Sequence, residues 1–343
     1  MKKILFLHPS AQTLFYSQDR DDCNVPYIEL RLAFEQKGYK FHFEVEGDLL
    51  DYSFIFCVDL FDNSLWGHLK RIIKQDLNYR ILKRSIALGL EKKIVILLSE
   101  SLVIAPFNYK SANHKGISTI FTWQKQMVDN IKYFHFYLPV RYPSAYKQNI
   151  EFDEKKLVMN ISGNKFSSAK GELYSFRRHT IKELNTNFPN DFDLYGVGWD
   201  NNGIIVNLKR FLKYRQFDFT NYRTYRGAPL NKSSVIGGYK FNICYENARF
   251  DDYITEKIFD IFINESVPVF YGAPNIADYI PQNTFIHRDQ FETDAELMCY
   301  LAKVRRDEHE EYLNNISIFL GSEEFKNFDA KYFIRNIMKT VGI

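Results

Sequence analysis

Short, continuous apolar runs separated by helical patterns constrain the fold of this chain more than any other feature. The clearest run is KIVILL at residues 93–98. An uninterrupted apolar run of this length is typical of a strand that is buried on both faces of a parallel sheet. Similar runs recur in both halves of the chain, with amphipathic segments between them. We therefore expect a doubly wound α/β fold.

The runs divide into two sets, which predicts two domains. The expected strands occupy residues 3–7, 41–45, 53–58, 93–98, 117–122, 134–138, 157–161, 192–195, 239–245, 267–271 and 284–287. Residues 141–156 are polar, contain Pro143 and lack periodicity, so we place a linker there. We assign residues 1–150 to an N-terminal Rossmann-like domain. Residues 151–343 form the second Rossmann-like domain and end in a helical tract, with a cleft expected between the two domains.

Charge, cysteines and missing motifs exclude several classes of protein. The 45 basic and 42 acidic residues give a net charge of +3, too balanced for a nucleic-acid-binding surface. The four cysteines form no C-x-x-C pair, which excludes the usual zinc sites and favours a reducing, cytoplasmic location. The sequence has no G-x-G-x-x-G after a strand, no P-loop and no G-x-S-x-G. No apolar stretch approaches the roughly 20 residues of a spanning helix, so we expect a soluble protein.

The most informative stretch covers residues 239–291, where YEN at 245–247 is followed by YITEK at 253–257. Glu246 and Asn247 end an expected strand, and Glu256 and Lys257 fall in the first turn of the next helix. A helix N-terminus offers free N–H groups and a positive dipole end, and Lys257 adds a full charge. This arrangement predicts a diphosphate site. Spacing alone, however, fits a solvated Glu–Lys surface pair better.

The same stretch resembles the donor-binding signature of family 10 glycosyltransferases, the α-1,3/1,4-fucosyltransferases. That signature is a strand ending in F-E-N, then Y-[VI]-T-E-K-[IL], a helix and [VI]-P-[VI]-x-x-G, and here Tyr245 replaces the phenylalanine. The resemblance implies a bacterial-type enzyme with the GT-B fold. It implies inverting transfer, most simply α-1,3, of L-fucose from GDP-β-L-fucose to a hydroxyl of a surface glycan such as lipopolysaccharide or capsule. The linkage position and the acceptor stay open.

The resemblance also assigns roles to individual residues. Its donor-binding positions correspond to Arg177, Arg178, Glu246, Asn247, Tyr253, Glu256 and Lys257. Arg177 is the preferred partner of the diphosphate and Arg178 the second choice, because N-I-S-G-N replaces the family's S-N-P upstream and leaves the register open. Lys257 is the second cation on the departing diphosphate. Glu256 and Asn247 would hold ribose or fucose hydroxyls.

Glu100 is the expected catalytic base. It follows the strand at residues 93–98, and a carboxylate at the carboxyl end of such a strand can take the proton from an acceptor hydroxyl. The alternative is a loop or capping glutamate. Should Glu100 not be the base, Glu29 and Asp59 are the next candidates.

The expected partners are GDP-fucose and an oligosaccharide or glycolipid acceptor, with no nucleic acid and at most peripheral association with the inner face of a membrane. Asp251 and Asp252 are adjacent rather than spaced as D-x-D, so we expect no obligatory metal; stimulation by Mn²⁺ or Mg²⁺ is left open. Two alternatives remain. The donor is another GDP- or dTDP-deoxysugar, or the chain is a non-catalytic carbohydrate-binding protein on the same scaffold.

Overall fold

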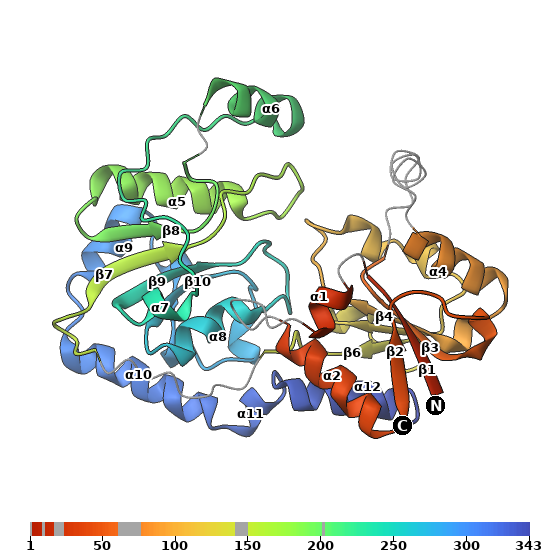
Figure 1. The fold of residues 1–343 in the computed structure, drawn as a ribbon. Helices are drawn as coiled ribbons and strands as arrows, with labels where there is room; N and C mark the ends of the chain where they lie inside the picture. Colours follow the sequence, from red (N-terminus) through yellow and green to blue (C-terminus); the bar gives the residue numbers. More distant parts are fainter. Residues whose placement is uncertain (1, 9–10, 17–23, 61–76, 141–149, 201–202) are drawn as a thin grey trace. The chain divides into compact units, whose positions relative to one another are not determined.

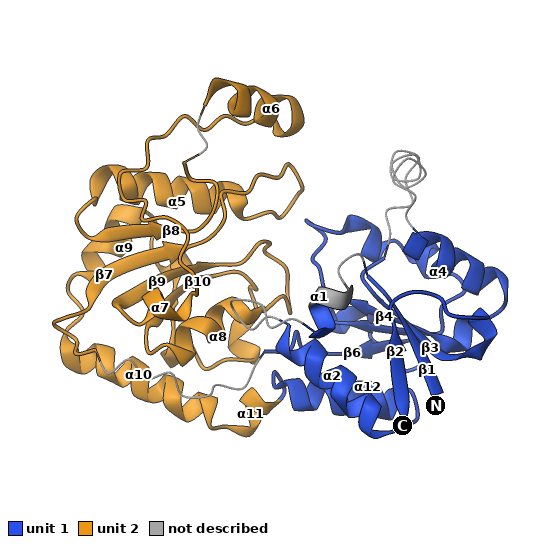
Figure 2. Ribbon diagram, in the orientation of Figure 1, with its two compact units in different colours: residues 1–141, 327–343 blue, residues 142–326 orange. Residues whose placement is uncertain are grey.

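The computed structural model describes residues 2–8, 11–16, 24–60, 77–140, 150–200 and 203–343. The chain divides into two compact units (Figure 2). Unit 1 contains residues 1–141 and 327–343, and unit 2 contains residues 142–326. Each unit is built on its own parallel sheet, so the predicted pair of Rossmann-like domains is confirmed.

Unit 1 is a six-stranded parallel sheet in the order β2-β1-β3-β4-β5-β6 (Figure 1). Its strands are β1 (Lys2–Leu7), β2 (Tyr39–His42), β3 (Tyr52–Val58), β4 (Ile94–Leu98), β5 (Thr119–Thr122) and β6 (Tyr133–His135). Its α-helices are α1 (Ala11–Tyr16), α2 (Val25–Gln36), α4 (Leu77–Ala87) and α12 (Ala330–Thr340). The chain leaves β1 toward β2 and then returns to β3 on the other side, which is the order of a doubly wound sheet.

The buried strands of unit 1 divide their side chains between two cores. Ile4 and Phe6 belong to one hydrophobic cluster, whereas Leu5 and Leu7 belong to the other. The same alternation runs along β4, the strand formed by the KIVILL run, whose five residues are all buried. Because successive strand residues point to opposite faces, a continuous apolar run is required when both faces are covered.

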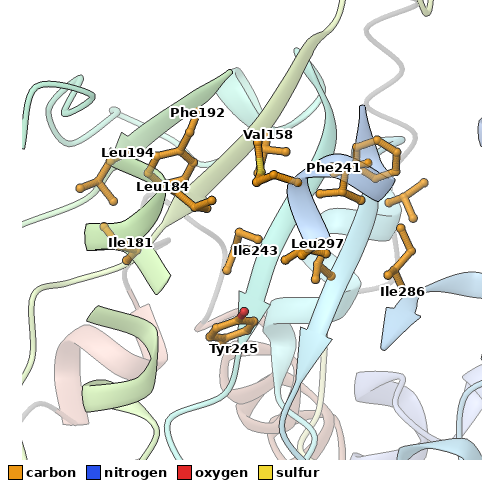
Figure 3. Close-up of a cluster of buried hydrophobic side chains, with 14 of the residues drawn as sticks. Val158, Ile181, Leu184, Phe192, Leu194, Phe241, Ile243, Tyr245, Ile286 and Leu297 are labelled. Carbon is orange, nitrogen blue, oxygen red and sulfur yellow. The ribbon is translucent and has the colours of Figure 1, made fainter. Parts of the chain in front are cut away.

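Unit 2 is a five-stranded parallel sheet in the order β11-β10-β9-β7-β8. Its strands are β7 (Lys156–Ile161), β8 (Phe192–Tyr195), β9 (Tyr239–Tyr245), β10 (Val267–Tyr271) and β11 (Ile286–His287). Its α-helices are α5 (Tyr174–Asn187), α6 (Ile204–Tyr214), α7 (Ser233–Ile236), α8 (Glu256–Ile263), α9 (Asp294–Leu301), α10 (Arg306–Leu320) and α11 (Glu323–Lys326). In Figure 3, side chains from β7, β8 and β9 meet Ile181 and Leu184 of α5, and Leu297 of α9 joins the same core.

The last residues of the chain differ from the prediction. Residues 327–343 were expected to close the C-terminal domain, but they belong to unit 1. The reason is the amphipathic pattern of α12, whose Phe333 and Ile337 are buried in the same cluster as Leu30 and Phe34 of α2. A pattern of this kind shows that a helix needs an apolar partner but does not say which one.

Two further expectations differ in detail. The helical tract predicted over residues 294–319 is two helices, α9 and α10, and α6 was not predicted at all. Most of the predicted linker, residues 141–149, lies outside the described residues. Within the part of the chain that the structure describes, no helix is both long and apolar enough to cross a membrane.

The imidazole of His309 makes the stability of unit 2 depend on pH. His309 lies on α10, is almost fully buried between the rings of Phe152 and Phe241, and its Nε2 lies 3.1 Å from the Lys240 carbonyl. Burial lowers the pKa of His309 to about 4. Below pH 6.5 the unfolded chain binds a proton that the folded chain resists. Stability is therefore full above pH 6.5 and falls as the pH drops toward 4, by roughly 3 kcal/mol for this group.

Urea denaturation between pH 4 and 7.5 tests this expectation. His309→Gln removes the titrating group and should flatten the pH dependence, whereas the exposed His179→Gln should not. The burial-lowered pKa of His287 acts in the same direction and is retained in both variants. If the free energy of unfolding fell equally steeply with pH in the wild type and in His309→Gln, His309 would not be the cause of the pH dependence.

Candidate functional site

A cavity opens at the carboxyl ends of β7 and β9 in unit 2. From β7 the chain passes to β8 on one side and later to β9 on the other, so β7 and β9 form the switch point of this sheet, where doubly wound folds bind ligands. The cavity has a volume of about 260 Å³. It is lined by Asn160, Ile161, Ser162, Gly163, Lys165, Arg177, Lys232, Ile236, Asn242, Ile243, Cys244, Tyr245, Asn247, Glu256, Lys257, Asp260 and Ile261.

Arg177 supplies the most deeply buried charge of this cavity. It lies on the first turn of α5 and is 4% exposed. Its Nη1 donates to the Tyr245 carbonyl at 3.3 Å, and its guanidinium lies over the Tyr174 ring at 5.2 Å. Burial lowers the pKa of Arg177 to about 10, which still leaves it charged at neutral pH. A buried guanidinium whose hydrogen-bond partner is neutral favours an anion beside it.

Glu246 lies behind the cavity and positions Lys257. Its carboxylate is fully buried and accepts from the Thr255 amide at 2.9 Å and the Thr255 hydroxyl at 2.8 Å. The Lys257 ammonium donates to its other oxygen at 2.6 Å. Glu246 therefore ties the end of β9 to the first turn of α8. Glu246 is not among the residues that line the cavity, whereas Lys257 is.

The first turn of α8 brings both signs of charge to the cavity. Glu256 is the first residue of the helix, and Lys257 follows it. Burial would raise the pKa of Glu256, but Lys257 and Lys232 hold it below its usual value, so the carboxylate stays ionised as a hydrogen-bond acceptor. Lys232 itself pairs with Asp260 at 3.1 Å. The first turn of α8 thus places an ionised carboxylate and an ammonium group side by side at the cavity.

Besides Glu246, two more of the sequence-predicted donor-binding residues are not among those that line the cavity. The guanidinium of Arg178 donates to the Lys165 carbonyl and to Gln216 Oε1, and lies over the Phe166 ring at 3.9 Å. It lines a separate groove of about 550 Å³. Tyr253 is buried and is not among the lining residues. Of the two candidate arginines, the structure brings Arg177 to the cavity.

Lys232 and Lys165 were missed as cavity residues. Lys232 precedes α7, in the segment between β8 and β9, where no site residue was expected. Lys165 lies in the loop after β7. The signal that could have found Lys165 is topological, because loops that follow the two strands of a switch point approach the same site. Lys232 lies before β9, so this signal does not apply to it.

In unit 1, two of the candidate carboxylates share one edge of the sheet. Asp59 follows β3 and accepts from the amides of Ser99 and Glu100 at 2.8 and 3.0 Å, and from Asn108 Nδ2 at 2.6 Å. Burial raises the pKa of Asp59, against the hydrogen bonds that lower it. Glu100 follows β4, and its carbonyl accepts from the Tyr109 hydroxyl at 2.8 Å.

The third candidate carboxylate is separate from these two. Glu29 lines a groove between α2 and α12. Asp59 is occupied in holding the backbone of the loop that carries Glu100. Of the three candidates, Glu100 is the one that follows a central strand and whose backbone is held there, by Asp59 at its amide and Tyr109 at its carbonyl.

We expect Glu246→Gln to destabilise unit 2. The amide can still serve Thr255 but leaves Lys257 without its counter-charge, which should lower the free energy of unfolding by about 1–3 kcal/mol. The effect stays below that of a fully buried pair because the Lys257 side chain is 25% exposed. Urea denaturation measures the change. The matched control is Glu323→Gln, which breaks the exposed pair with Lys326 and should cost less than about 1 kcal/mol. Equal losses in the two variants would contradict a special role for Glu246.

Known proteins match this chain mainly around the cavity. Residues 173–317 match the model described as "Glycosyltransferase family 10 (fucosyltransferase) C-term". The α-(1,3)-fucosyltransferase FucT of Helicobacter pylori is 30% identical over 108 residues, 31% of this chain and 22% of that protein. The GDP-fucose protein O-fucosyltransferase 3 of Bos taurus is 41% identical over 75 residues, 22% of this chain and 16% of that protein. The matched segments thus span about a fifth of the length of these curated relatives.

Solved structures match along the whole chain. The crystal structure of an α1,3-fucosyltransferase with GDP covers 100% of this chain and 90% of its own, with a TM-score of 0.53 and 13% identity. A glycosyltransferase from Rickettsia africae covers 99% and 97%, with a TM-score of 0.56 and 10% identity. Anabaena HepE in complex with UDP-glucose covers 100% of both chains, with a TM-score of 0.55 and 10% identity. At these identities the likeness shows the fold, which is the GT-B fold. Residues 173–317 of this chain are similar to the C-terminal domain of glycosyltransferase family 10, the fucosyltransferase family.

Proposed function

We propose that this protein is an inverting α-1,3-fucosyltransferase, which moves L-fucose from GDP-β-L-fucose to a hydroxyl of a surface-glycan acceptor. The observation that carries the proposal is the cavity at the switch point of β7 and β9. It combines a helix N-terminus with the side chains of Arg177, Lys232 and Lys257 inside the segment that matches the family. This is a site for a nucleoside diphosphate rather than for a neutral ligand.

The cations of the cavity would drive departure of GDP. Negative charge grows on the diphosphate as its bond to the sugar breaks, and charges already held in place stabilise it without reorganisation. Arg177 can bind two phosphate oxygens at once, and Lys257 is held for the same task by Glu246. Lys232 also lines the cavity, where its ammonium is paired with Asp260. We propose that this set replaces an obligatory metal ion.

Glu256 and Asn247 would hold hydroxyl groups of the donor. Glu256 is kept ionised by Lys257 and Lys232 and lines the cavity with Asn247. An ionised carboxylate accepts strong hydrogen bonds from the hydroxyls of ribose or fucose. Binding both the sugar and the phosphates would fix the orientation of the bond that breaks.

Glu100 of unit 1 would act as the general base. It would take the proton of the acceptor hydroxyl while that oxygen attacks the anomeric carbon from the face opposite GDP, which inverts the configuration. The transition state has oxocarbenium character, as in glycoside hydrolysis. The hydrogen bonds from the Ser99 and Glu100 amides to Asp59 would keep the loop that carries Glu100 in place.

We expect GDP to bind this protein more tightly than UDP and to raise its melting temperature more, because a ligand bound only by the folded state stabilises it by mass action. Arg177→Ala and Lys257→Ala should each weaken GDP binding by about 10- to 100-fold, the loss of one charge-assisted contact. Calorimetric titration in the presence of EDTA measures these affinities without divalent metals.

Arg178→Ala is the matched control for these variants. It removes the same side chain from the neighbouring position of α5, outside the cavity, and should leave GDP affinity unchanged. Stabilisation by UDP equal to that by GDP would remove a GDP-sugar from the proposal. An effect of Arg178→Ala alone would show that the diphosphate binds elsewhere.

We expect Glu100→Gln to lower turnover by about 10²–10⁴-fold, the usual contribution of a general base. Glutamine keeps the size of the side chain but cannot accept the proton. GDP affinity and the circular dichroism spectrum should stay those of the wild type, because the residue lies outside the donor cavity of unit 2. Turnover is measured with GDP-fucose and a panel of N-acetyllactosamine acceptors, and NMR of the product gives the linkage. Glu29→Gln serves as the control; wild-type turnover of Glu100→Gln would exclude Glu100 as the base.

A further inference from the structure

Helix α6 carries an exposed apolar face. Ile204, Ile205, Leu208 and Leu212 are between 54% and 79% exposed. The last three lie one, four and eight residues after Ile204, and this spacing places all four on one side of the helix. Large aliphatic side chains gathered on one face of a helix normally pack against a core, so their exposure marks this face as a surface for interaction.

The opposite face of α6 is attached to unit 2. The buried Asn207 side chain donates to the Asp218 carbonyl at 2.8 Å and accepts from the Asp218 amide at 2.6 Å. The Arg210 guanidinium lies over the Phe166 ring at 4.6 Å, and the Tyr214 ring stacks with the same ring at 6.1 Å. These contacts fix the rotation of the helix about its axis. In Figure 1, α6 lies at the margin of unit 2, beyond α5.

Aromatic rings extend the apolar surface past the end of the helix. Phe211 stacks with Phe217 at 4.6 Å, and Phe217 with Phe219 at 5.9 Å. Phe217 and Phe219 are both more than half exposed. Phenylalanine and leucine on one side of a short basic helix are typical of helices that lie in the plane of a membrane interface.

The charges around this face are positive. Lys209 and Lys213 are exposed beside the aliphatic side chains, and Arg215 ends the helix in the left-handed conformation. Helix α6 contains no acidic residue. The nearby Asp218 is buried and occupied by hydrogen bonds from Asn164 and Tyr222, so it does not offset these charges at the surface.

This combination distinguishes among possible partners. A second copy of the chain, placed face to face through α6, would bring the same lysines together and be opposed by their repulsion. An anionic lipid surface satisfies both features at once, because its acyl region accepts the aliphatic side chains and its headgroups attract the lysines.

We propose that α6, with the rings of Phe211, Phe217 and Phe219, is a membrane-surface anchor that inserts into the interface of an anionic lipid bilayer. The aliphatic face enters the boundary between headgroups and acyl chains, and Lys209 and Lys213 contact lipid phosphates. This anchor is independent of the proposed transferase activity, since none of its residues lines the cavity of unit 2.

Co-sedimentation of the full chain with vesicles tests the anchor. Wild type should bind vesicles of phosphatidylcholine with phosphatidylglycerol and bind phosphatidylcholine alone much more weakly. Leu208→Ser and Leu212→Ser should each weaken binding by about tenfold, the cost of losing one buried leucine side chain. Lys209→Gln and Lys213→Gln should each weaken it by about fivefold, and added salt should do the same.

Ile318→Ser is the matched control, because Ile318 is a comparably exposed aliphatic residue on α10 of the same unit. It should bind as wild type does, and circular dichroism and melting temperature verify the fold of every variant. Unchanged vesicle binding by the double variant Leu208→Ser/Leu212→Ser would overturn the proposal, and so would an equal loss of vesicle binding in Ile318→Ser. The proposal would also be overturned if sedimentation velocity showed the wild type to be a dimer and Leu208→Ser a monomer, because the face would then bind a second copy of the chain.

Discussion

The carboxylate of Glu246 connects the sheet of unit 2 to the helix that faces the cavity. Glu246 directly follows β9, and its carboxylate is fully buried. It accepts hydrogen bonds from three donors, the amide and hydroxyl of Thr255 and the ammonium of Lys257. A buried carboxylate is costly unless its oxygens are satisfied, and here both oxygens are. The first turn of α8 is held at the carboxyl end of β9 as a result. The position of that turn determines where Glu256 and Lys257 meet the cavity.

The surrounding backbone makes room for this carboxylate. A Cβ atom at Gly272, just after β10, would lie 2.7 Å from Glu246 Cγ and 2.6 Å from the Phe270 ring. Only a residue without a side chain fits there while Glu246 keeps its place. On the other side, the Tyr245 carbonyl accepts from Arg177. Tyr245 thus orients one cation and Glu246 fixes a second, while Tyr245 and Asn247 line the cavity.

The two units differ in how they use their carboxylates. In unit 2, the Glu246 carboxylate binds Thr255 and Lys257 of the protein itself, whereas Glu256 stays ionised near Lys257 and Lys232. In unit 1, the Asp59 carboxylate accepts a hydrogen bond from the backbone of the loop after β4, and burial raises its pKa. In each unit one carboxylate positions a neighbour that carries the proposed chemistry.

The sequence by itself determined the two parallel sheets, because short continuous apolar runs such as residues 93–98, which recur between amphipathic segments, are typical of strands covered on both faces. It also located the stretch around YEN and YITEK, whose spacing sets a strand end and a helix start next to each other. Tertiary structure decided which side chains reach the cavity. Arg177 and Arg178 are adjacent in sequence, yet 100° of helical rotation separates them, so one faces β9 and the other Phe166. It also decided that α12 packs on α2 and that Lys232 joins the cavity, because contacts between distant segments depend on topology rather than on local pattern.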